Sequence, residues 1–163
     1  MKNTEMRQEL IQLGGGAHAL AIQILGNPDD AADAVHEAFA KVLARPAAYD
    51  VNKGAFKPWF LRVVRNQCVD LLRRRRTVES VNALVNPGKA PDQALEALQR
   101  DESLKRALSG MPAEQRQILV LRDYLDLSYA EIADVLSLAA GTVMSRLHRA
   151  RLALRGVLER NDG

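Results

Sequence analysis

Residues 127–151, LSYAEIADVLSLAAGTVMSRLHRAR, contain the local pattern that decides the fold. Ser128 and Glu131 have the spacing of a capping box, in which a serine hydroxyl and a glutamate carboxylate satisfy backbone N–H groups at the start of a helix. Leu127 and Ile132 occupy the positions of a hydrophobic staple around that box. The stretch therefore predicts a short helix that begins directly after Ser128.

A second helix follows this one after a short turn. The first helix is expected to end near Ser137, and the turn Leu138-Ala139-Ala140-Gly141 leads to a helix that begins at Thr142. Helix pairs of this kind, with an arginine-rich second member, form the helix-turn-helix motif of DNA-binding proteins. Generic helix pairs share the pattern, but the polar outer face of the second helix favours DNA binding. That face contains Ser145, Arg146, His148 and Arg149.

The rest of the chain also has helical periodicity, which predicts an all-α protein of two small domains joined by a flexible linker. We expect the first domain at 1–76, the linker at 77–91 and the second domain at 92–163, where Asp92 caps a helix. The linker loses the apolar pattern and contains Asn86-Pro87-Gly88. At about 3.3 Å per extended residue it is long enough for the domains to lie well apart.

An acidic helix is predicted after Asn27, with Pro28 at its first position and Pro46 as its stop. Its polar face is acidic in the N-terminal half. The acidic residues are Asp29, Asp30, Asp33 and Glu37. Two interpretations are open: these carboxylates stabilise the helix dipole, or they form a docking surface for a basic partner.

Residues 49–57 are predicted to form a loop, and Pro58 to open a long helix that ends in Arg73 to Arg76. Four of the seven aromatic residues lie in this loop and the helix start. They are Tyr49, Phe56, Trp59 and Phe60. They form either a local core or, beside an arginine-rich helix, a surface on which unpaired bases stack.

Charge and composition narrow the class of protein. Residues 57–76 contain seven basic side chains and one acidic, and residues 142–160 contain five and one. Such stripes are either solvated faces or phosphate-binding surfaces. The single cysteine, the polar N-terminus and the lack of an apolar run of about 20 residues predict a soluble cytoplasmic protein without membrane insertion.

No pattern of residues supports catalysis, a cofactor or a metal. The Gly14-Gly15-Gly16 run lacks the lysine of a phosphate-binding loop. A zinc-binding helix of the His-Glu-x-x-His type has a second histidine four residues after the first. In this chain the residue four positions after His36 is Ala40. We therefore expect no catalytic residue, no metal site and no enzyme activity.

Four stretches together resemble a known family. Residues 27–39 (NPDDAADAVHEAF) and 56–76 (FKPWFLRVVRNQCVDLLRRRR) resemble region 2 of bacterial sigma factors. Residues 119–133 (LVLRDYLDLSYAEIA) and 141–151 (GTVMSRLHRAR) resemble region 4. Both regions occur in the family's order, with a short linker. The chain is thus similar to the extracytoplasmic-function (ECF) group of the sigma-70 family over most of residues 20–158.

This resemblance implies a subunit that binds core RNA polymerase, directs it to promoter DNA and helps to melt the duplex. It implies an anti-sigma protein as a further partner. The acidic residues of 29–37 would dock on the clamp helices of the polymerase. The loop and the next helix would bind the unpaired −10 element through Asn52, Lys53, Phe56, Trp59, Arg62, Arg65 and Asn66. The C-terminal helix would read the −35 element through Thr142, Met144, Ser145, Arg146, His148 and Arg149.

Two departures from the family pattern bear on these expectations. The three glycines at 14–16 stand where the family continues its first helix, which predicts a broken or displaced helix. Met144 stands where many members have lysine or arginine. A contact that those members make with the DNA backbone or a base is therefore not expected at this position.

Two other kinds of protein compete with this interpretation. A stand-alone helix-turn-helix regulator would bind duplex DNA without polymerase, and it leaves the aromatic loop and the acidic helix unexplained. An interaction protein that mimics a sigma lobe to sequester a regulator would tolerate loss of the arginine stripe.

Overall fold

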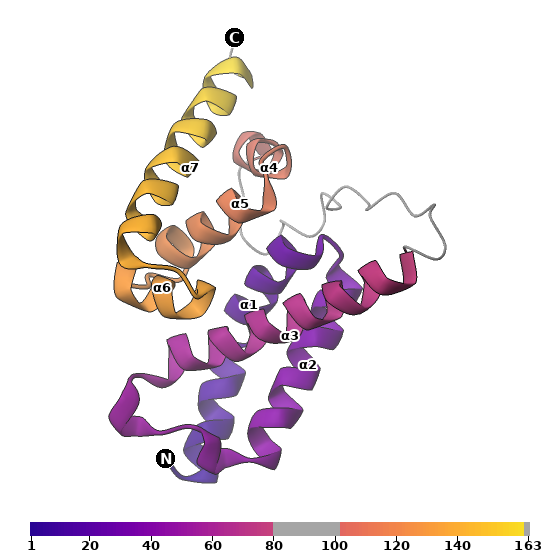
Figure 1. The fold of residues 1–163 in the computed structure, drawn as a ribbon, viewed down its shortest axis with the longest axis vertical. Coiled ribbons are helices and arrows are strands. Elements are labelled where there is room, and N and C mark those ends of the chain that lie inside the picture. The colour runs from indigo at the N-terminus through magenta and orange to yellow at the C-terminus, as the bar shows by residue number, and fades with distance from the viewer. Residues whose placement is uncertain (80–101, 162–163) are drawn as a thin grey trace.

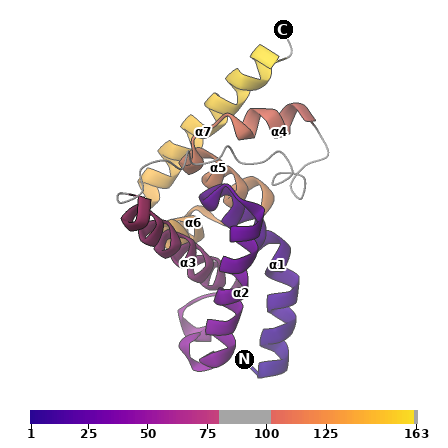
Figure 2. The same cartoon turned by 90° about the vertical axis from the view of Figure 1, so that its right-hand side faces the viewer.

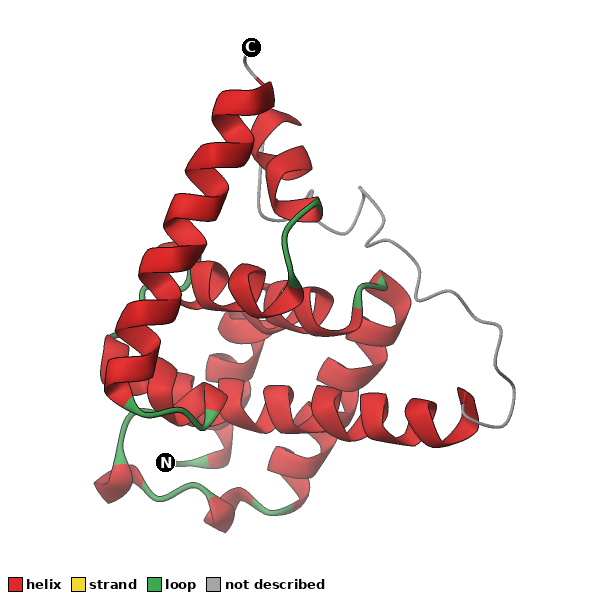
Figure 3. Ribbon diagram, turned by 45° about the horizontal axis from the view of Figure 1, so that its top comes forward, coloured by secondary structure: helices red, strands yellow, loops and turns green. Residues whose placement is uncertain are grey.

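The computed structural model describes residues 1–79 and 102–161, and within these ranges every regular element is a helix (Figures 1 and 3). The all-α prediction is confirmed. The elements are α1 (Asn3–Leu25), α2 (Pro28–Ala44), the 3-10 turns η1 (Pro46–Ala48) and η2 (Val51–Lys53), α3 (Phe56–Glu79), α4 (Glu102–Ser109), α5 (Ala113–Leu119), the π-helical turn η4 (Val120–Tyr124), α6 (Tyr129–Leu136) and α7 (Ala140–Asn161).

Helices α1, α2 and α3 form the N-terminal lobe. Helix α1 runs without a break through the three glycines at 14–16, so the expectation of a broken first helix is wrong. Glycine lowers helix stability by about 1 kcal/mol relative to alanine, but packing overrides so small a preference. Buried side chains such as Leu10 and Leu20 hold the helix on both sides of the glycines.

Helix α2 begins as its sequence predicts. The Asn27 Oδ1 atom accepts hydrogen bonds from the backbone N–H groups of Asp29 (2.8 Å) and Asp30 (3.1 Å), and Pro28 fills the first helical position. The helix ends at Ala44, before Pro46. The N-cap and the proline fix where α2 begins after α1, and so fix the position of the acidic residues in its first turns.

Helix α3 is longer than predicted at both ends. It begins at Phe56 rather than Pro58, and it continues to Glu79, past the expected domain boundary at residue 76. Proline is accommodated in the first turn because its missing N–H has no helical partner there. The rest of the expected linker and the helix start at Asp92 lie outside the described residues.

Helices α4 to α7 form the C-terminal lobe, and the capping box that begins α6 is present. The backbone N–H of Glu131 donates to Ser128 Oγ (3.1 Å), and the backbone N–H of Ser128 donates to Glu131 Oε1 (2.8 Å). Leu127 and Ile132 are buried at the staple positions. Helix α7 begins at Ala140, two residues earlier than predicted.

The two lobes pack against each other, although the linker is long enough to let them lie well apart. Helix α3 crosses the base of the C-terminal lobe beside α6, and α1 contacts α5 (Figures 1 and 2). Buried apolar residues of both lobes form one continuous cluster. The length of a linker limits how far two lobes separate; it does not prevent complementary surfaces from meeting.

Removing the Ser128 hydroxyl tests how much the capping box of α6 contributes to stability. Ser128→Ala should lower the free energy of unfolding by about 0.5–2 kcal/mol, because the Glu131 N–H loses its acceptor. Urea denaturation followed by circular dichroism measures this change. The control, Ser145→Ala on the exposed face of α7, removes a hydroxyl that caps no helix and should change stability by much less. Equal losses in the two variants would contradict the capping role.

Candidate nucleic-acid interface

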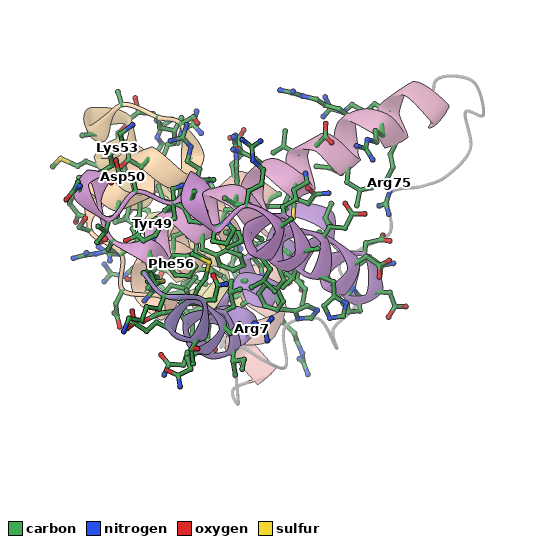
Figure 4. All side chains as sticks on the ribbon, turned by 90° about the horizontal axis from the view of Figure 1, so that it is seen from below. Arg7, Tyr49, Asp50, Lys53, Phe56 and Arg75 are labelled. Carbon is green, nitrogen blue, oxygen red and sulfur yellow. The ribbon has the colours of Figure 1, made fainter. Side chains whose placement is uncertain are left out.

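An open pocket of about 300 Å³ lies where the loop before α3 meets the first turn of that helix. Tyr49 and Trp59 provide its aromatic side, and Lys53 and Arg62 its basic side. Figure 4 shows Tyr49, Asp50 and Lys53 close together at this end of α3, far from Arg75 at the other end. An aromatic surface beside cationic groups is suited to stacking an unpaired base and holding its phosphate.

A cluster of aromatic rings fixes the shape of this pocket. The ring centroid of Tyr49 lies 5.1 Å from that of Phe56 and 5.2 Å from that of Trp59. The Tyr49 hydroxyl donates a hydrogen bond to the Gly54 carbonyl (2.8 Å), which closes the loop. Gly54 has φ of 143°, a conformation that favours glycine. The aromatic residues therefore form a local core, and part of that core lines an open pocket.

The structure separates the seven residues predicted for the −10 strand into three groups. Lys53, Trp59 and Arg62 line the pocket. Phe56 is buried beneath it, 5% exposed, and supports the two rings above. Asn52, Arg65 and Asn66 do not line this pocket. Asn52 is exposed in η2, and Arg65 and Asn66 lie further along α3 in a second, basic hollow.

Arg65 of α3 is partly buried and lies close to two other arginines. Burial lowers its pKa, and the nearby positive charges of Arg73 and Arg62 lower it further. The guanidinium is nevertheless far from losing its proton at neutral pH. Its Nη1 donates to Asn66 Oδ1 (3.3 Å). Three clustered positive charges repel one another, and a phosphate placed among them relieves that repulsion.

The four acidic residues of α2 differ in whether their carboxylates interact with other side chains of the protein. Asp30 forms an ion pair with Arg75 (2.5 Å), and Glu37 accepts a hydrogen bond from Gln67 Nε2 (2.6 Å). Within the described residues no ion pair is found for Asp29 or Asp33, which are exposed one helical turn apart. Asp29 and Asp33 therefore have the carboxylates most available to a partner.

The predicted −35 residues lie along the solvent side of α7. Met144, Ser145, His148 and Arg149 are exposed, whereas Val143 on the opposite side is fully buried. Thr142 and Arg146 are partly buried, and Arg146 Nη1 lies 3.9 Å from a Glu114 carboxylate oxygen. The helix thus presents a polar, arginine-containing face of the kind that enters a major groove.

Sequence reasoning named Tyr49 only as a member of the aromatic cluster, and it missed two charged residues that line the aromatic pocket, Asp50 and Asp134. Tyr49 and Asp50 belong to the loop, and the aromatic clustering in the sequence was a usable signal for Tyr49. Asp134 comes from α6 of the other lobe, and only the packing of the two lobes brings it there. Cys68 is fully buried, and burial raises its pKa to about 12, so it is a core thiol rather than a nucleophile.

The described residues contain no cluster of three or more histidine, cysteine or acidic side chains arranged to hold a metal. No helix among them has both the length and the hydropathy needed to cross a bilayer.

Comparison with known proteins identifies both lobes. Family models of sigma-70 region 2 and sigma-70 region 4 match residues 11–78 and 101–154. The ECF RNA polymerase sigma factor SigL of Mycobacterium tuberculosis is 32% identical over 143 residues, which cover 85% of this chain and 80% of SigL. The chain belongs to the ECF group of the sigma-70 family. SigW of Bacillus subtilis is similar to this sigma factor over 151 residues at 28% identity, covering 85% of this chain and 80% of SigW.

Solved structures agree with this placement. This sigma factor is similar to RpoE from Bartonella quintana, determined with the anti-sigma factor NepR, with a TM-score of 0.80 and 27% identity over 95% of this chain and 97% of RpoE. CnrH, determined with the cytosolic domain of CnrY, has a TM-score of 0.68 at 21% identity and shows the same fold. As a sigma factor, the protein directs RNA polymerase to promoters in transcription initiation. Since region 2 accounts for the N-terminal lobe, the stand-alone regulator is not favoured.

Proposed function

We propose that this sigma factor melts its promoters by trapping an unpaired −10 base in the aromatic pocket of the N-terminal lobe, while α7 reads the −35 element. The observation that carries this proposal is the pocket itself, where Trp59 and Tyr49 form an aromatic side next to Lys53 and Arg62. Removing a base from the stack costs a few kcal/mol, which stacking and phosphate contacts offset. Phe56 acts from beneath the pocket as a positioning residue.

The remaining predicted residues continue the same path. Arg65 and Asn66 lie one to two turns further along α3, where the phosphates of the next nucleotides would follow the helix. Asn52 is exposed in the loop before it. On α7, Arg146 and Arg149 supply donors for guanine edges, and Met144 supplies an apolar contact of the kind that a thymine methyl accepts. Thr142, Ser145 and His148 complete that surface.

The acidic face of α2 is proposed as the docking surface for core RNA polymerase. Asp29 and Asp33 provide available carboxylates, and Asp30 and Glu37 hold α2 against α3 while adding to the negative potential. The protein is proposed to be a non-catalytic specificity subunit that acts in the cytoplasm, where the polymerase is. An anti-sigma protein is proposed as its regulator, since the similar RpoE was determined in complex with the anti-sigma factor NepR.

The experiment that tests the proposed function is co-elution of the purified chain with bacterial core RNA polymerase, followed by transcription from genomic fragments. Co-elution and discrete start sites are expected. Tight binding to duplex DNA by a chain that fails to bind a competent core would overturn the proposal.

Charge reversal tests the docking surface. Asp33→Lys should weaken binding to core polymerase, because an exposed carboxylate that meets a basic partner becomes a repelling cation. Glu5→Lys is the matched control, since it makes the same charge change on an exposed position of α1. Size-exclusion co-elution at two salt concentrations measures both. Equal retention of the two variants would remove α2 from the docking surface.

Truncation of the pocket tests base trapping. Trp59→Ala should reduce open-complex formation about tenfold, since stacking contributes about 1–3 kcal/mol per base, and should leave core binding unchanged. Trp59→Phe should restore most of the activity because it keeps a stacking face. Permanganate reactivity of the −10 thymines measures opening. If opening and core binding fall together, Trp59 has a structural role only.

Removal of one arginine tests −35 reading. Arg149→Ala should lower affinity for the −35 duplex by about tenfold or more, as expected when a bidentate contact to guanine is lost, with core binding intact. Arg155→Ala, two turns away and paired with Glu159, is the control. Competition between specific and unrelated duplexes reports selectivity. Unchanged selectivity in Arg149→Ala would show that this side chain reads no base.

A further inference from the structure

A groove of about 320 Å³ is lined by residues of α1 and α3 on one side and of α5, α6 and α7 on the other. It shares no lining residue with the aromatic pocket. Its volume lies at the lower end of the range of about 300–1,000 Å³ that small-molecule sites have. The chemistry of its lining residues therefore indicates what kind of small molecule it would hold.

One part of the lining is aliphatic. Val69 and Leu72 come from α3, Ile24 from the end of α1 and Leu138 from the turn after α6, and all four are partly buried. Ile24 and Leu138 also pack against the apolar core, whereas the core cluster of the described residues does not include Val69 or Leu72. These two side chains keep apolar surface that an aliphatic group in the groove would remove from water.

The other part of the lining is positively charged. Arg65 and Arg76 of α3 and Arg146 of α7 all line the groove, and the one acidic lining residue is Glu114. The Glu114 side chain is 77% exposed, and its carboxylate oxygen lies 3.9 Å from Arg146 Nη1. An exposed ion pair of this length contributes little. The groove thus has an excess of positive charge that its own acidic residue does not neutralise.

Arg65 differs from other arginines of α3 in its partner. Arg74 and Arg75, which do not line the groove, pair with the carboxylates of Asp70 and Asp30. The hydrogen-bond partner of Arg65 among the described residues is the neutral amide of Asn66. Burial and the neighbouring arginines lower the pKa of Arg65. A carboxylate in the groove would offset both unfavourable effects, because an opposite charge favours the protonated guanidinium.

These two parts of the lining select among small anions. The lining contains no aromatic ring on which the base of a nucleotide would stack. Inorganic phosphate would leave the aliphatic surface exposed to water. An aliphatic carboxylate matches both parts, because its tail covers apolar side chains and its head accepts the paired hydrogen bonds that a guanidinium donates.

We propose that this groove is a binding site for the anion of a medium-chain fatty acid, with the tail on Val69 and Leu72 and the carboxylate among the arginines. The modest volume favours a medium chain over a long one. Arg65 and Arg146 also belong to the surfaces proposed for the −10 strand and the −35 element. A bound fatty acid therefore competes with promoter DNA for these two side chains. The inference goes beyond the proposed function, and the site does not depend on it.

Competition between ligands tests the chemistry of the site. Equilibrium dialysis of radiolabelled decanoate against the full chain, below the micelle concentration, should show one saturable site. Decanol, butyrate and tripolyphosphate should each compete at least about tenfold more weakly, since each lacks either the charged head or the aliphatic tail. Decanol equal to decanoate would exclude the arginines, butyrate equal to it would exclude the aliphatic surface, and a stronger effect of tripolyphosphate would indicate a phosphate site. Each of these results would overturn the proposal.

Two substitutions in the groove test its location. Leu72→Gln and Arg146→Gln should each weaken decanoate binding about tenfold, through loss of apolar contact and of a charge-assisted hydrogen bond. Leu152→Gln and Arg155→Gln are the matched controls, because both residues are exposed on α7 outside the groove. Circular dichroism establishes that all four variants fold. Equal affinity in the four variants would show that decanoate binds only as an adventitious amphiphile.

A measurement on the unaltered chain decides the location even if a groove variant does not fold. In a sample with isotope-labelled leucine and valine methyl groups, decanoate should shift the NMR signals of Val69 and Leu72. The signals of Val51 and Leu152, which are exposed elsewhere, should stay unchanged. The reverse pattern, or no shift at all, would overturn the site. Failure of the chain to bind core polymerase would instead overturn the proposed function and leave this site in place.

Discussion

The N-terminal lobe depends on the burial of one ring, Phe60. It is fully buried, stacks on Phe39 of α2 at 5.5 Å and on Phe56 at 5.9 Å, and so fixes α3 to its neighbours. Because Phe56 in turn supports Trp59 and Tyr49, the open pocket is the outer layer of an aromatic stack whose inner layers are core. Rigid support of this kind lets a surface pocket keep its shape without a bound strand.

Local signals in the sequence predicted the elements well. The Asn27 cap, the capping box at Ser128 and the stop before Pro46 are short-range hydrogen-bonding and steric effects, which the structure retains. The error at the glycines of α1 has a cause outside the local sequence. Helix propensity is worth less than the burial of neighbouring side chains, and burial depends on residues distant in the sequence.

The candidate sites were predictable where one element carries them. The exposed arginine face of α7 and the acidic face of α2 follow from helical periodicity alone. The aromatic pocket was only partly predictable, because it needs Tyr49 from the loop and Asp134 from the other lobe. The packing of the lobes was not predictable, since a linker of this length permits both contact and separation, and the contact between α1 and α5 has no local signature.

The continuous apolar cluster has a consequence for folding cooperativity. Helix α1 is shared: it packs against α2 and α3 on one side and against α5 on the other. A shared helix couples the stabilities of the two lobes, so that heat unfolds the packed lobes as a single cooperative unit, whereas separated lobes unfold independently. The same helix therefore sets both the conformation of the free protein and the number of thermal transitions it undergoes.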